Sequence, residues 1–429
     1  MDSRAGIGSA TRCSSAGSGV SPCPGCREAP EGGPILFLLP YPSLSGLELF
    51  CLRFAADLLA RGIPVAVASP AGGMIDQQCR QRGIPSFHLA ELRRFDPHAV
   101  LRLARFIEGR EPLSIGGHDL TGRPARAVVA FRTQAIYPLH LARLLKQSHV
   151  PFFLFYRIGA GNYQRRDPLH RVLFRHLAAV VPNADHVARK ILNYWAIARD
   201  KVVCIRSGVD TDRYRPDEAR RTAFRAGLGI PEDAILIGNA GRIHPEKGSE
   251  ILIDTVFGPD GVGAGRPDVH LAYVGREYQS GYIDALRARA AGYGAGERFH
   301  PVPFRDDIEA VHPGFDLFAL AVTSHETYAY TALEAMACGV PAIVPAIGGM
   351  SEMFEDGVEG FFFRHRDTAS LRQSLAKAVS LDAARRRAMG AAARARILRS
   401  AGWSAMMDRY LALFARFAVD LRPIQAVSR

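Results

Sequence analysis

Two carboxylate side chains, Glu326 and Glu334, stand in one segment of the chain with seven residues between them. The segment predicts a loop around Glu326 and a helix over Thr331–Cys338 that contains Glu334 and ends at Gly339. Carboxylates beside a phosphate-binding turn would be repelled by the phosphate, but they accept hydrogen bonds from the hydroxyl groups of a sugar or a ribose. The spacing alone favours a plainer interpretation, a helix-capping acid and an exposed helix acid.

The start of this expected helix is a candidate phosphate site. The residues at this N-terminus are Tyr328, Ala329, Tyr330 and Thr331. Backbone N–H groups in the first turn have no partner within the helix, and the helix dipole favours an anion there. We therefore expect the amides of Tyr328–Thr331 to contribute to the binding of a phosphate.

A second segment, Gly238–Gly248, places Arg242 and Lys247 on a glycine-flanked loop between an expected strand and an expected helix. Two cations at the carboxyl end of a strand suit a diphosphate, because charge-assisted hydrogen bonds to phosphate are strong. A connecting loop with solvated charges is the alternative interpretation of this segment. Both segments lie in the same half of the chain, so together they indicate a ligand with phosphates and hydroxyl groups much more strongly than either does.

Alternating strands and helices must position these segments. Short apolar runs suit strands buried in a parallel sheet, and apolar residues at helical spacing indicate the helices between them. In the first half the expected strands are Ile35–Leu39, Pro64–Ala68, Ala127–Phe131, Pro151–Phe155, Leu177–Val181 and Val202–Ile205. The expected helices are Gly46–Ala60, Ala99–Ile107, Tyr137–Lys146 and Asp185–Trp195. This alternation is typical of a Rossmann-like fold.

A second α/β series follows a segment rich in charge, Gly and Pro. Its expected strands are Ala234–Ile237, His270–Val274, Leu317–Ala321, Ala342–Val344 and Phe361–Phe363, and its last helices are Arg385–Arg399 and Trp403–Phe417. We predict an α/β protein with a disordered tail over 1–33, Rossmann-like domains over 34–207 and 217–400, a linker over 208–216 and a C-terminal helical segment over 401–429. Ligands bind at the carboxyl ends of strands in such sheets, so two facing domains would form a site in the cleft between them.

Composition and charge limit the class of protein. The 429 residues are 48% hydrophobic and 22% charged, which excludes a largely disordered chain, a collagen-like repeat and a coiled coil. Lys and Arg number 54 against 42 Asp and Glu, and the excess is almost all arginine. It lies in residues 34–200, which hold 22 basic and 11 acidic residues. An anionic partner molecule or an anionic membrane surface accounts for this excess, whereas no nucleic-acid-binding module is recognisable.

No N-terminal signal peptide is visible, and no run reaches the roughly 18 apolar residues of a membrane-spanning helix. We therefore expect a cytoplasmic protein, either soluble or peripheral on the inner face of the membrane. Cys23 and Cys26 are interpreted as stray thiols, because a zinc site needs four ligands. Asp210 and Asp212 have the spacing of Mg²⁺ ligands, but they lie in the expected linker, far along the chain from the phosphate-binding segments. We expect no metal.

These motifs together resemble the retaining glycosyltransferases of the GT-B fold, specifically glycosyltransferase family 4. The resemblance extends over about Ile35–Phe417, and its elements appear in the family's order. In the first half, Ser45–Glu48 matches the Gly-Gly-x-Glu loop and Arg61–Val65 matches the turn into the second strand, and Gly208–Asp210 with Pro216 matches the stretch between the domains. In the second half, Gly241–Arg242 with Lys247–Gly248 matches the diphosphate-binding pair, and Glu326 with Glu334 matches the Glu-x7-Glu motif. The last two elements are Gly348–Gly349 with Glu352 and Asp356–Gly357 with Gly360. The resemblance implies two facing Rossmann-like domains with a cleft between them and a C-terminal helix that crosses back to the first domain.

The resemblance also implies roles for the candidate residues. Arg242 and Lys247 would neutralise the diphosphate of a nucleotide-sugar donor. Glu334 would bind the ribose, Glu326 would bind the donor sugar, and the amides of Tyr328–Thr331 would complete the phosphate site. Family members transfer the sugar with retention and commonly need no metal. The resemblance therefore implies catalysis by Glu326, Arg242 and Lys247, with no cofactor besides the donor substrate.

Three positions depart from the family's pattern. Ser45 stands where the family has Gly, but Gly46 is present and would let the first loop approach the donor, because it has no side chain. After the expected strand Pro151–Phe155, Arg157 stands where many members have His. Arg157 would place a cation over the acceptor, and pairing with a local carboxylate is the alternative. Tyr328–Tyr330 replaces a glycine-containing segment of the family, which indicates an unusual donor-sugar pocket.

The function implied by the resemblance is that of a hexosyltransferase-like enzyme. It would move a sugar from a nucleotide-diphosphate sugar to an acceptor hydroxyl, in glycolipid, lipopolysaccharide or cell-envelope polysaccharide synthesis. The basic first domain would handle an anionic glycan or a lipid-linked acceptor. The alternative hypotheses are a catalytically weak nucleotide-sugar-binding protein and another GT-B enzyme, a phosphorylase or an epimerase.

Overall fold

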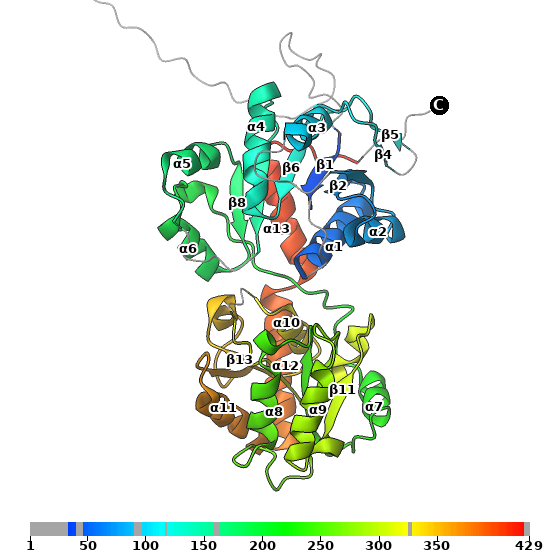
Figure 1. Ribbon diagram of the computed structural model, residues 1–429, viewed down its shortest axis with the longest axis vertical. Helices are drawn as coiled ribbons and strands as arrows, with labels where there is room; N and C mark the ends of the chain where they lie inside the picture. The colour runs from blue at the N-terminus through cyan, green and yellow to red at the C-terminus, as the bar shows by residue number, and fades with distance from the viewer. Residues whose placement is uncertain are drawn as a thin grey trace, which may run out of the picture.

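Two six-stranded parallel sheets, one in each half of the chain, form the core of the protein, as predicted. The computed structural model describes residues 33–39, 46–89, 97–115, 118–146, 148–157, 164–324 and 328–423. Glu326, Ser45 and all of the expected tail except Gly33 lie outside the described residues. Figure 1 shows the two sheets in two domains that follow one another along the longest axis of the molecule.

The first sheet has the strand order β3-β2-β1-β6-β7-β8, with every pairing parallel. Its strands are β1 (Ile35–Leu38), β2 (Val65–Ser69), β3 (Ser86–His88), β6 (Ala127–Ala130), β7 (Phe152–Tyr156) and β8 (Ala179–Pro182). The helices around it are α1 (Gly46–Ala60), α2 (Met74–Gln81), α3 (Pro97–Ile107), α4 (Ile136–Lys146), α5 (Pro168–Arg175) and α6 (Asp185–Tyr194). The short strands β4 (Ser114–Ile115) and β5 (His118–Asp119) pair antiparallel outside it. The chain order reverses between β1 and β6, and such a reversal opens a crevice at the carboxyl ends of the strands.

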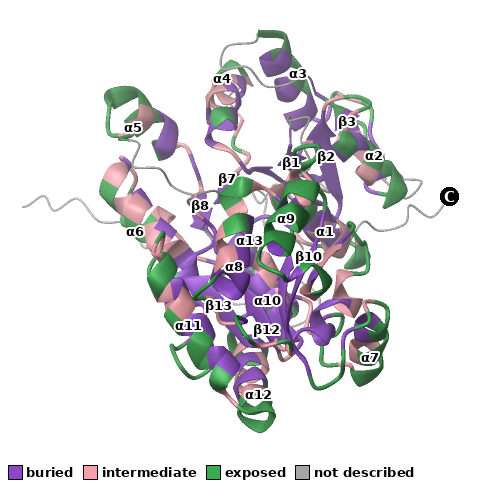
Figure 2. Ribbon diagram, turned by 60° about the horizontal axis from the view of Figure 1, so that its bottom comes forward, coloured by how far each residue is buried: buried purple, intermediate pink, exposed green. Residues whose placement is uncertain are grey.

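The second sheet repeats this plan with the order β11-β10-β9-β12-β13-β14. Its strands are β9 (Ile235–Ala240), β10 (Val269–Val274), β11 (Phe299–Val302), β12 (Leu317–Ala319), β13 (Ala342–Pro345) and β14 (Gly360–Phe363). Its helices are α7 (Glu218–Ala226), α8 (Ser249–Phe257), α9 (Tyr282–Gly292), α10 (Tyr330–Ala337), α11 (Thr368–Ser380) and α12 (Ala383–Ser400). Short 3-10 turns are η1 (Thr133–Ala135), η2 (Arg199–Lys201), η3 (Pro245–Lys247), η4 (Gly296–Arg298), η5 (Ile308–Ala310), η6 (His312–Gly314) and η7 (Gly348–Glu352). Figure 2 shows buried strands inside and exposed helix faces outside, which explains the continuous apolar runs of the strands.

The last helix, α13 (Trp403–Arg416), crosses back to the first domain, as predicted. Its inner face packs on the first sheet, where the ring of Tyr410 lies 4.9 Å from that of Phe54 and 4.6 Å from that of Phe155, measured between centroids. Phe414 on the same face is fully buried. In Figure 1 this red helix lies within the upper domain, while α12 lies in the lower one. The end of the chain is therefore part of the first domain's core.

Three short edge segments differ from the sequence-based expectation. Val202–Ile205 is not a strand, because only Val202 forms a bridge, to Val180 of β8. The edge strands β3 and β11 were not expected. Each contains residues that weaken a strand pattern, His88 in β3 and Pro301 in β11, and a proline is tolerated at a sheet edge because its missing N–H is not needed there. Among the described residues, no helix has the length and apolar character needed to cross a membrane.

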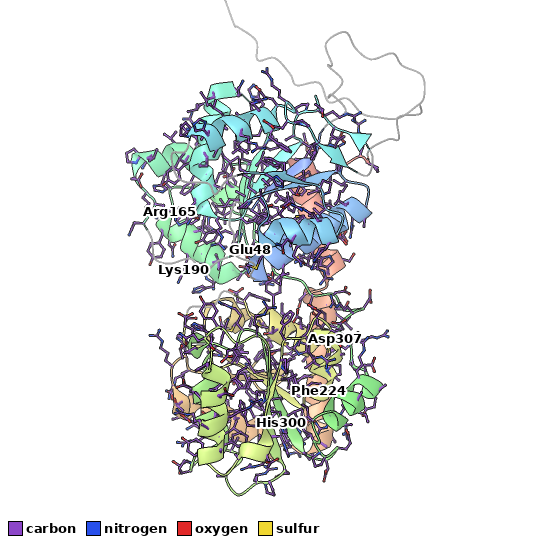
Figure 3. All side chains as sticks on the ribbon, turned by 45° about the vertical axis from the view of Figure 1, so that its right-hand side comes forward. Glu48, Arg165, Lys190, Phe224, His300 and Asp307 are labelled. Carbon is purple, nitrogen blue, oxygen red and sulfur yellow. The ribbon has the colours of Figure 1, made fainter. Side chains whose placement is uncertain are left out.

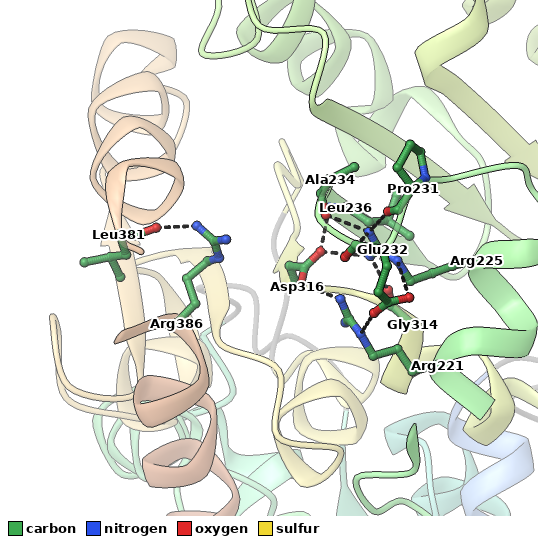
Figure 4. A network of polar contacts seen from close by, with 10 residues as sticks. All are labelled: Arg221, Arg225, Pro231, Glu232, Ala234, Leu236, Gly314, Asp316, Leu381 and Arg386. Atoms are coloured by element: carbon green, nitrogen blue, oxygen red, sulfur yellow. Dashed lines mark hydrogen bonds and ion pairs between the residues drawn. The ribbon is translucent and has the colours of Figure 1, made fainter. Parts of the chain in front are cut away.

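A buried arginine fixes the start of the second sheet. Arg225 on α7 is 1% exposed and donates to Asp316 at 3.0 Å. It also donates to the carbonyl oxygens of Gly314, Pro231 and Ala234, as Figure 4 shows. Asp316 in turn accepts the N–H of Leu236 at the beginning of β9. Burying a charge is costly unless it is paired and hydrogen-bonded, so this network anchors α7 to the end of the sheet opposite the candidate site.

Replacing Asp316 with Asn should lower the free energy of unfolding by about 3 kcal/mol, because it leaves a buried guanidinium without its carboxylate. Urea titration followed by circular dichroism measures the change. The matched control is Asp260→Asn, since the Asp260 side chain is 85% exposed where it pairs with Arg372. That change should cost less than about 1 kcal/mol. Equal, small effects of both substitutions would contradict the anchoring role of Arg225.

Candidate functional site

The carboxyl ends of β9, β10 and β12 meet at the edge of the second sheet that carries the predicted site loops. The backbone of Gly248 lies directly against the loop after β12, since a Cβ there would stand 1.9 Å from the carbonyl oxygen of Ala321. Thr323 in that loop donates its N–H to the carbonyl oxygen of Glu246 at 2.9 Å. Gly248 also has a φ of 72°, which favours glycine. The segment with Arg242 and Lys247 is thereby joined to the segment that leads to α10.

Both predicted cations lie on this loop. Arg242 is exposed, and its guanidinium carbon lies 5.8 Å from the ring centroid of Tyr278. Lys247 ends η3 and is half-buried. The left-handed Gly248 follows Lys247 and starts α8. The structure thus places the two positive side chains at the carboxyl end of β9, as the sequence predicted.

The helix α10 begins at Tyr330, one residue before the expected start. Its N-cap residue is Ala329, which offers no side-chain acceptor, so the first amides of the helix are available to a ligand. Tyr328 and Ala329 are buried, whereas Tyr330 and Thr331 are half-buried. This helix start lies at the same edge of the sheet as the loop with the two cations.

Glu334 lies one turn into α10 and has a 20% exposed side chain. Its Oε2 stands 3.5 Å from Nε2 of His312, a fully buried residue of η6. Tyr214, from the segment between the two sheets, also contacts Glu334. Burial raises the pKa of Tyr214, and the charge of Glu334 and a hydrogen bond to it raise that pKa further. These two neighbours hold the carboxylate in place, and neither of them stands in a motif that sequence analysis could recognise.

In the first domain, the candidate residues of the glycine-containing motif lie at the start of α1. Gly46 is its first residue and is exposed, and a Cβ there would meet no other heavy atom of the described residues within 4 Å. Protein packing therefore does not require a glycine at this position. Glu48, the acid of the same motif, is fully buried and accepts a hydrogen bond from Arg132 at 2.9 Å. Figure 3 shows Glu48 near the boundary between the two domains.

Arg157, predicted to face the acceptor, is 6% exposed at the end of β7. It donates to the Tyr410 hydroxyl at 2.9 Å and to Ser207 Oγ at 2.8 Å, and its guanidinium carbon lies 3.5 Å from the ring centroid of Phe50. Burial lowers the pKa of Arg157. Ser207 donates onward to the hydroxyl of Tyr330 at 3.0 Å. These contacts give Arg157 a structural role that joins both domains, and its contact with an acceptor stays a prediction.

The acidic pair of the expected linker has structural partners. Asp210 accepts a hydrogen bond from Arg53 at 2.8 Å, and its other oxygen accepts the N–H groups of Asp212 and Arg213. Over the described ranges, no three His, Cys, Asp or Glu side chains cluster in a way that could hold a metal ion. Asp210 therefore acts as a turn-forming acid in this structure.

Two family models match the chain in order. "Glycosyltransferase Family 4" matches residues 44–213, and "Glycosyl transferases group 1" matches residues 220–396. The chain is similar to the D-inositol 3-phosphate glycosyltransferase of Geodermatophilus obscurus, with 31% identity over 254 residues that make up 56% of this chain and 53% of that protein. The corresponding Mycobacterium tuberculosis protein is 28% identical over 241 residues, covering 55% of this chain and 48% of the relative. The chain thus spans about half the length of the curated relatives it matches.

Solved structures resemble this one over nearly its full length. Anabaena Alr3699/HepE in complex with UDP and glucose has a TM-score of 0.71 at 19% identity, covering 90% of this chain and 100% of that one. A glycosyltransferase from Rickettsia africae has a TM-score of 0.76 at 17% identity, covering 90% and 99%. WaaG, a glycosyltransferase involved in lipopolysaccharide biosynthesis, has a TM-score of 0.61 at 17% identity, covering 89% and 99%. At these identities the likeness concerns the fold, which is GT-B.

Proposed function

Because the chain belongs to the glycosyltransferases of family 4 and group 1, we propose that it transfers a sugar from a nucleotide-diphosphate sugar to an acceptor hydroxyl. The observation that carries this proposal is the convergence at one strand-end edge of the Arg242–Lys247 loop, the uncapped start of α10 and the carboxylate of Glu334. Cations and free amides suit a diphosphate, and the carboxylate suits ribose hydroxyl groups. Anabaena HepE is described with UDP and glucose, which supports a donor of this class.

In this proposal the donor's leaving group sets the catalytic demand. Negative charge grows on the diphosphate as the bond to the sugar breaks, and preorganised positive groups stabilise that charge. In this proposal the positive groups are Arg242, Lys247 and the first amides of α10. They do the work that a metal ion would otherwise do, so we propose a metal-independent reaction without a cofactor. Glu326 would bind the donor sugar, Gly46 would let α1 approach it, and the sugar would be transferred with retention.

The acceptor in this proposal is anionic. The first domain carries nearly all of the chain's excess of basic residues, 22 against 11 acidic residues over 34–200. The curated relatives are named for D-inositol 3-phosphate, a phosphorylated acceptor, which supports an anionic group on the acceptor here. A glycan or lipid-linked acceptor of the cell envelope has the same property. Arg157 would act at the rear of this acceptor site through its contact with Tyr330.

One assay tests the proposed function. The protein is incubated with a panel of UDP- and GDP-sugars, in EDTA, with inositol phosphate, lipid-linked and oligosaccharide acceptors. We expect release of the nucleoside diphosphate that depends on the acceptor, and a product whose anomeric configuration by NMR matches that of the donor. Failure to release or to bind UDP or GDP would refute the proposal. Donor cleavage that needs phosphate and no acceptor would identify a phosphorylase instead.

Removing either charge of the proposed donor site should slow turnover. Lys247→Ala and Glu326→Ala should each lower kcat by at least about tenfold, a loss of about 1.4 kcal/mol of transition-state stabilisation. The matched controls are Lys377→Ala on α11 and Glu297→Ala on η4, both at exposed positions of the same domain. Steady-state kinetics measures all four. Wild-type rates in Lys247→Ala and Glu326→Ala would overturn the site assignment.

We also propose peripheral contact with an anionic membrane through the outer face of the first domain. The helix α4 packs against both α3 and α5, and Figure 1 shows α3 and α4 at the top and α5 at the left of the upper domain. They expose apolar side chains between arginines, and the exposed apolar residues are Leu101, Leu144, Leu145, Leu169 and Val172. Exposed apolar clusters mark interaction surfaces, and basic residues around them favour anionic lipid. Such a surface would bring a lipid-linked acceptor to the cleft.

Cosedimentation with vesicles tests this contact. The wild-type protein should sediment with phosphatidylglycerol vesicles much more than with phosphatidylcholine vesicles. The double substitution of Leu144 and Leu145 to Glu should reduce the bound fraction several-fold, because it places two negative charges on the contact face. Leu398→Glu, at a residue 52% exposed on α12 of the other domain, is the control and should bind like the wild type. Equal binding of the two variants would contradict the proposed surface.

A further inference from the structure

The helix α6 begins at the boundary between the domains without an N-cap of its own. Its N-cap residue is Ala184, which has no side-chain acceptor for the first amides. Four other helices start at an aspartate that accepts a backbone N–H of the first turn, namely α5, α7, α11 and α12. Alanine is a poor N-cap, so α6 needs an acceptor from elsewhere.

That acceptor comes from the other domain. Glu352, the last residue of η7, places Oε2 2.9 Å from the N–H nitrogen of Asp185 and Oε1 2.6 Å from that of His186. The Glu352 side chain is only 13% exposed, and Arg189 of α6 stands 3.5 Å from it. We call Glu352 with these two amides the interdomain cap. It joins residues 167 positions apart in the chain.

The interdomain cap is strong because three favourable effects coincide. The carboxylate meets the positive end of the helix dipole, it makes two charge-assisted hydrogen bonds, and its partial burial limits competition from water. A cavity of about 220 Å³ lies beside Glu352, and both domains line it, including Arg206, Tyr328 and Ile397. Apolar side chains of α6 and η7 belong to one buried cluster, and the interdomain cap adds directional hydrogen bonds to that packing.

Other described contacts between the domains include the Arg157 guanidinium carbon, which lies 5.5 Å from the ring centroid of Tyr330. Ser207 donates to Tyr330, and Arg213 donates to Glu309 at 2.8 Å. Ser207 and Arg213 lie in or next to the segment that connects the domains. The interdomain cap joins a helix of one domain to a turn of the other, so it breaks when the domains move apart.

We propose that the interdomain cap sets the balance between closed and open forms of the cleft, and that Glu352 is a positioning residue for sugar transfer. This rests on the proposed function, because closure brings the Arg242–Lys247 loop to the acceptor side. Glu352 acts through the amides of α6 and does not touch the donor. Its loss should change transfer but leave nucleotide binding by the second domain intact.

Four variants of the full chain test this proposal. Glu352→Ala should lower the closed population and kcat/KM by about tenfold, equivalent to about 1.4 kcal/mol. Glu352→Gln should have a smaller effect in the same direction, because it keeps an acceptor but loses the charge. Ala184→Ser gives α6 an N-cap of its own, so it should open the cleft while keeping or raising the melting temperature. Asp382→Ala, which removes the N-cap of α12 within one domain, is the control.

The readouts separate closure from folding. Small-angle X-ray scattering with bound UDP should give a larger radius of gyration for Glu352→Ala, Glu352→Gln and Ala184→Ser than for the wild type, with UDP affinity within about twofold. Asp382→Ala should lower the melting temperature without changing that radius. An unchanged radius and unchanged kcat/KM in both Glu352 variants would overturn the proposal. Scattering does not depend on turnover, so an inactive wild type would refute the proposed function without deciding the interdomain cap.

Discussion

A buried cation, the guanidinium of Arg157, links several pieces of chain at the boundary between the domains. It donates hydrogen bonds to the hydroxyl of Tyr410 on α13 and to that of Ser207 between the domains. Ser207 in turn donates to the hydroxyl of Tyr330. Desolvating a charge is costly, and hydrogen bonds and the nearby ring of Phe50 offset that cost. These contacts join α13 to the end of β7 and, by way of Ser207, to Tyr330 at the start of α10.

Parallel sheets impose the second constraint. All strands of such a sheet end at one edge, so loops far apart in sequence meet there. The loop after β9 and the loop after β12 touch through Gly248 and Ala321 at a distance that no side chain would allow. This contact joins the loop of Arg242 and Lys247 to the segment that leads to α10 and Glu334, although almost a hundred residues separate Arg242 from Glu334.

Local patterns predicted the elements that are buried in the middle of each sheet. The helix Gly46–Ala60 was predicted with both of its ends, because apolar residues on a helical spacing are a local signal. Edge strands such as β3 carry little of that signal, whereas Val202–Ile205 carries it but forms only one bridge to β8. Motifs identified the two cations and Glu334. Long-range partners leave no such pattern in the sequence. Tyr410, for example, accepts a hydrogen bond from Arg157 across 253 residues of chain.

Two helices, α6 and α10, share an N-cap residue that has no side-chain acceptor. Among the α-helices whose N-cap the structure describes, only α6 and α10 start at an alanine, and the others start at Asp or Gly. An alanine N-cap gives up about 1 kcal/mol of local stability. Both helices begin where the domains meet, α6 on one side and α10 on the other. The first turn of α6 is completed by Glu352 from the opposite domain, and in the proposed reaction the donor diphosphate completes that of α10. In both proposals, domain closure and donor binding each supply hydrogen-bond acceptors to a helix N-terminus whose own N-cap residue has none.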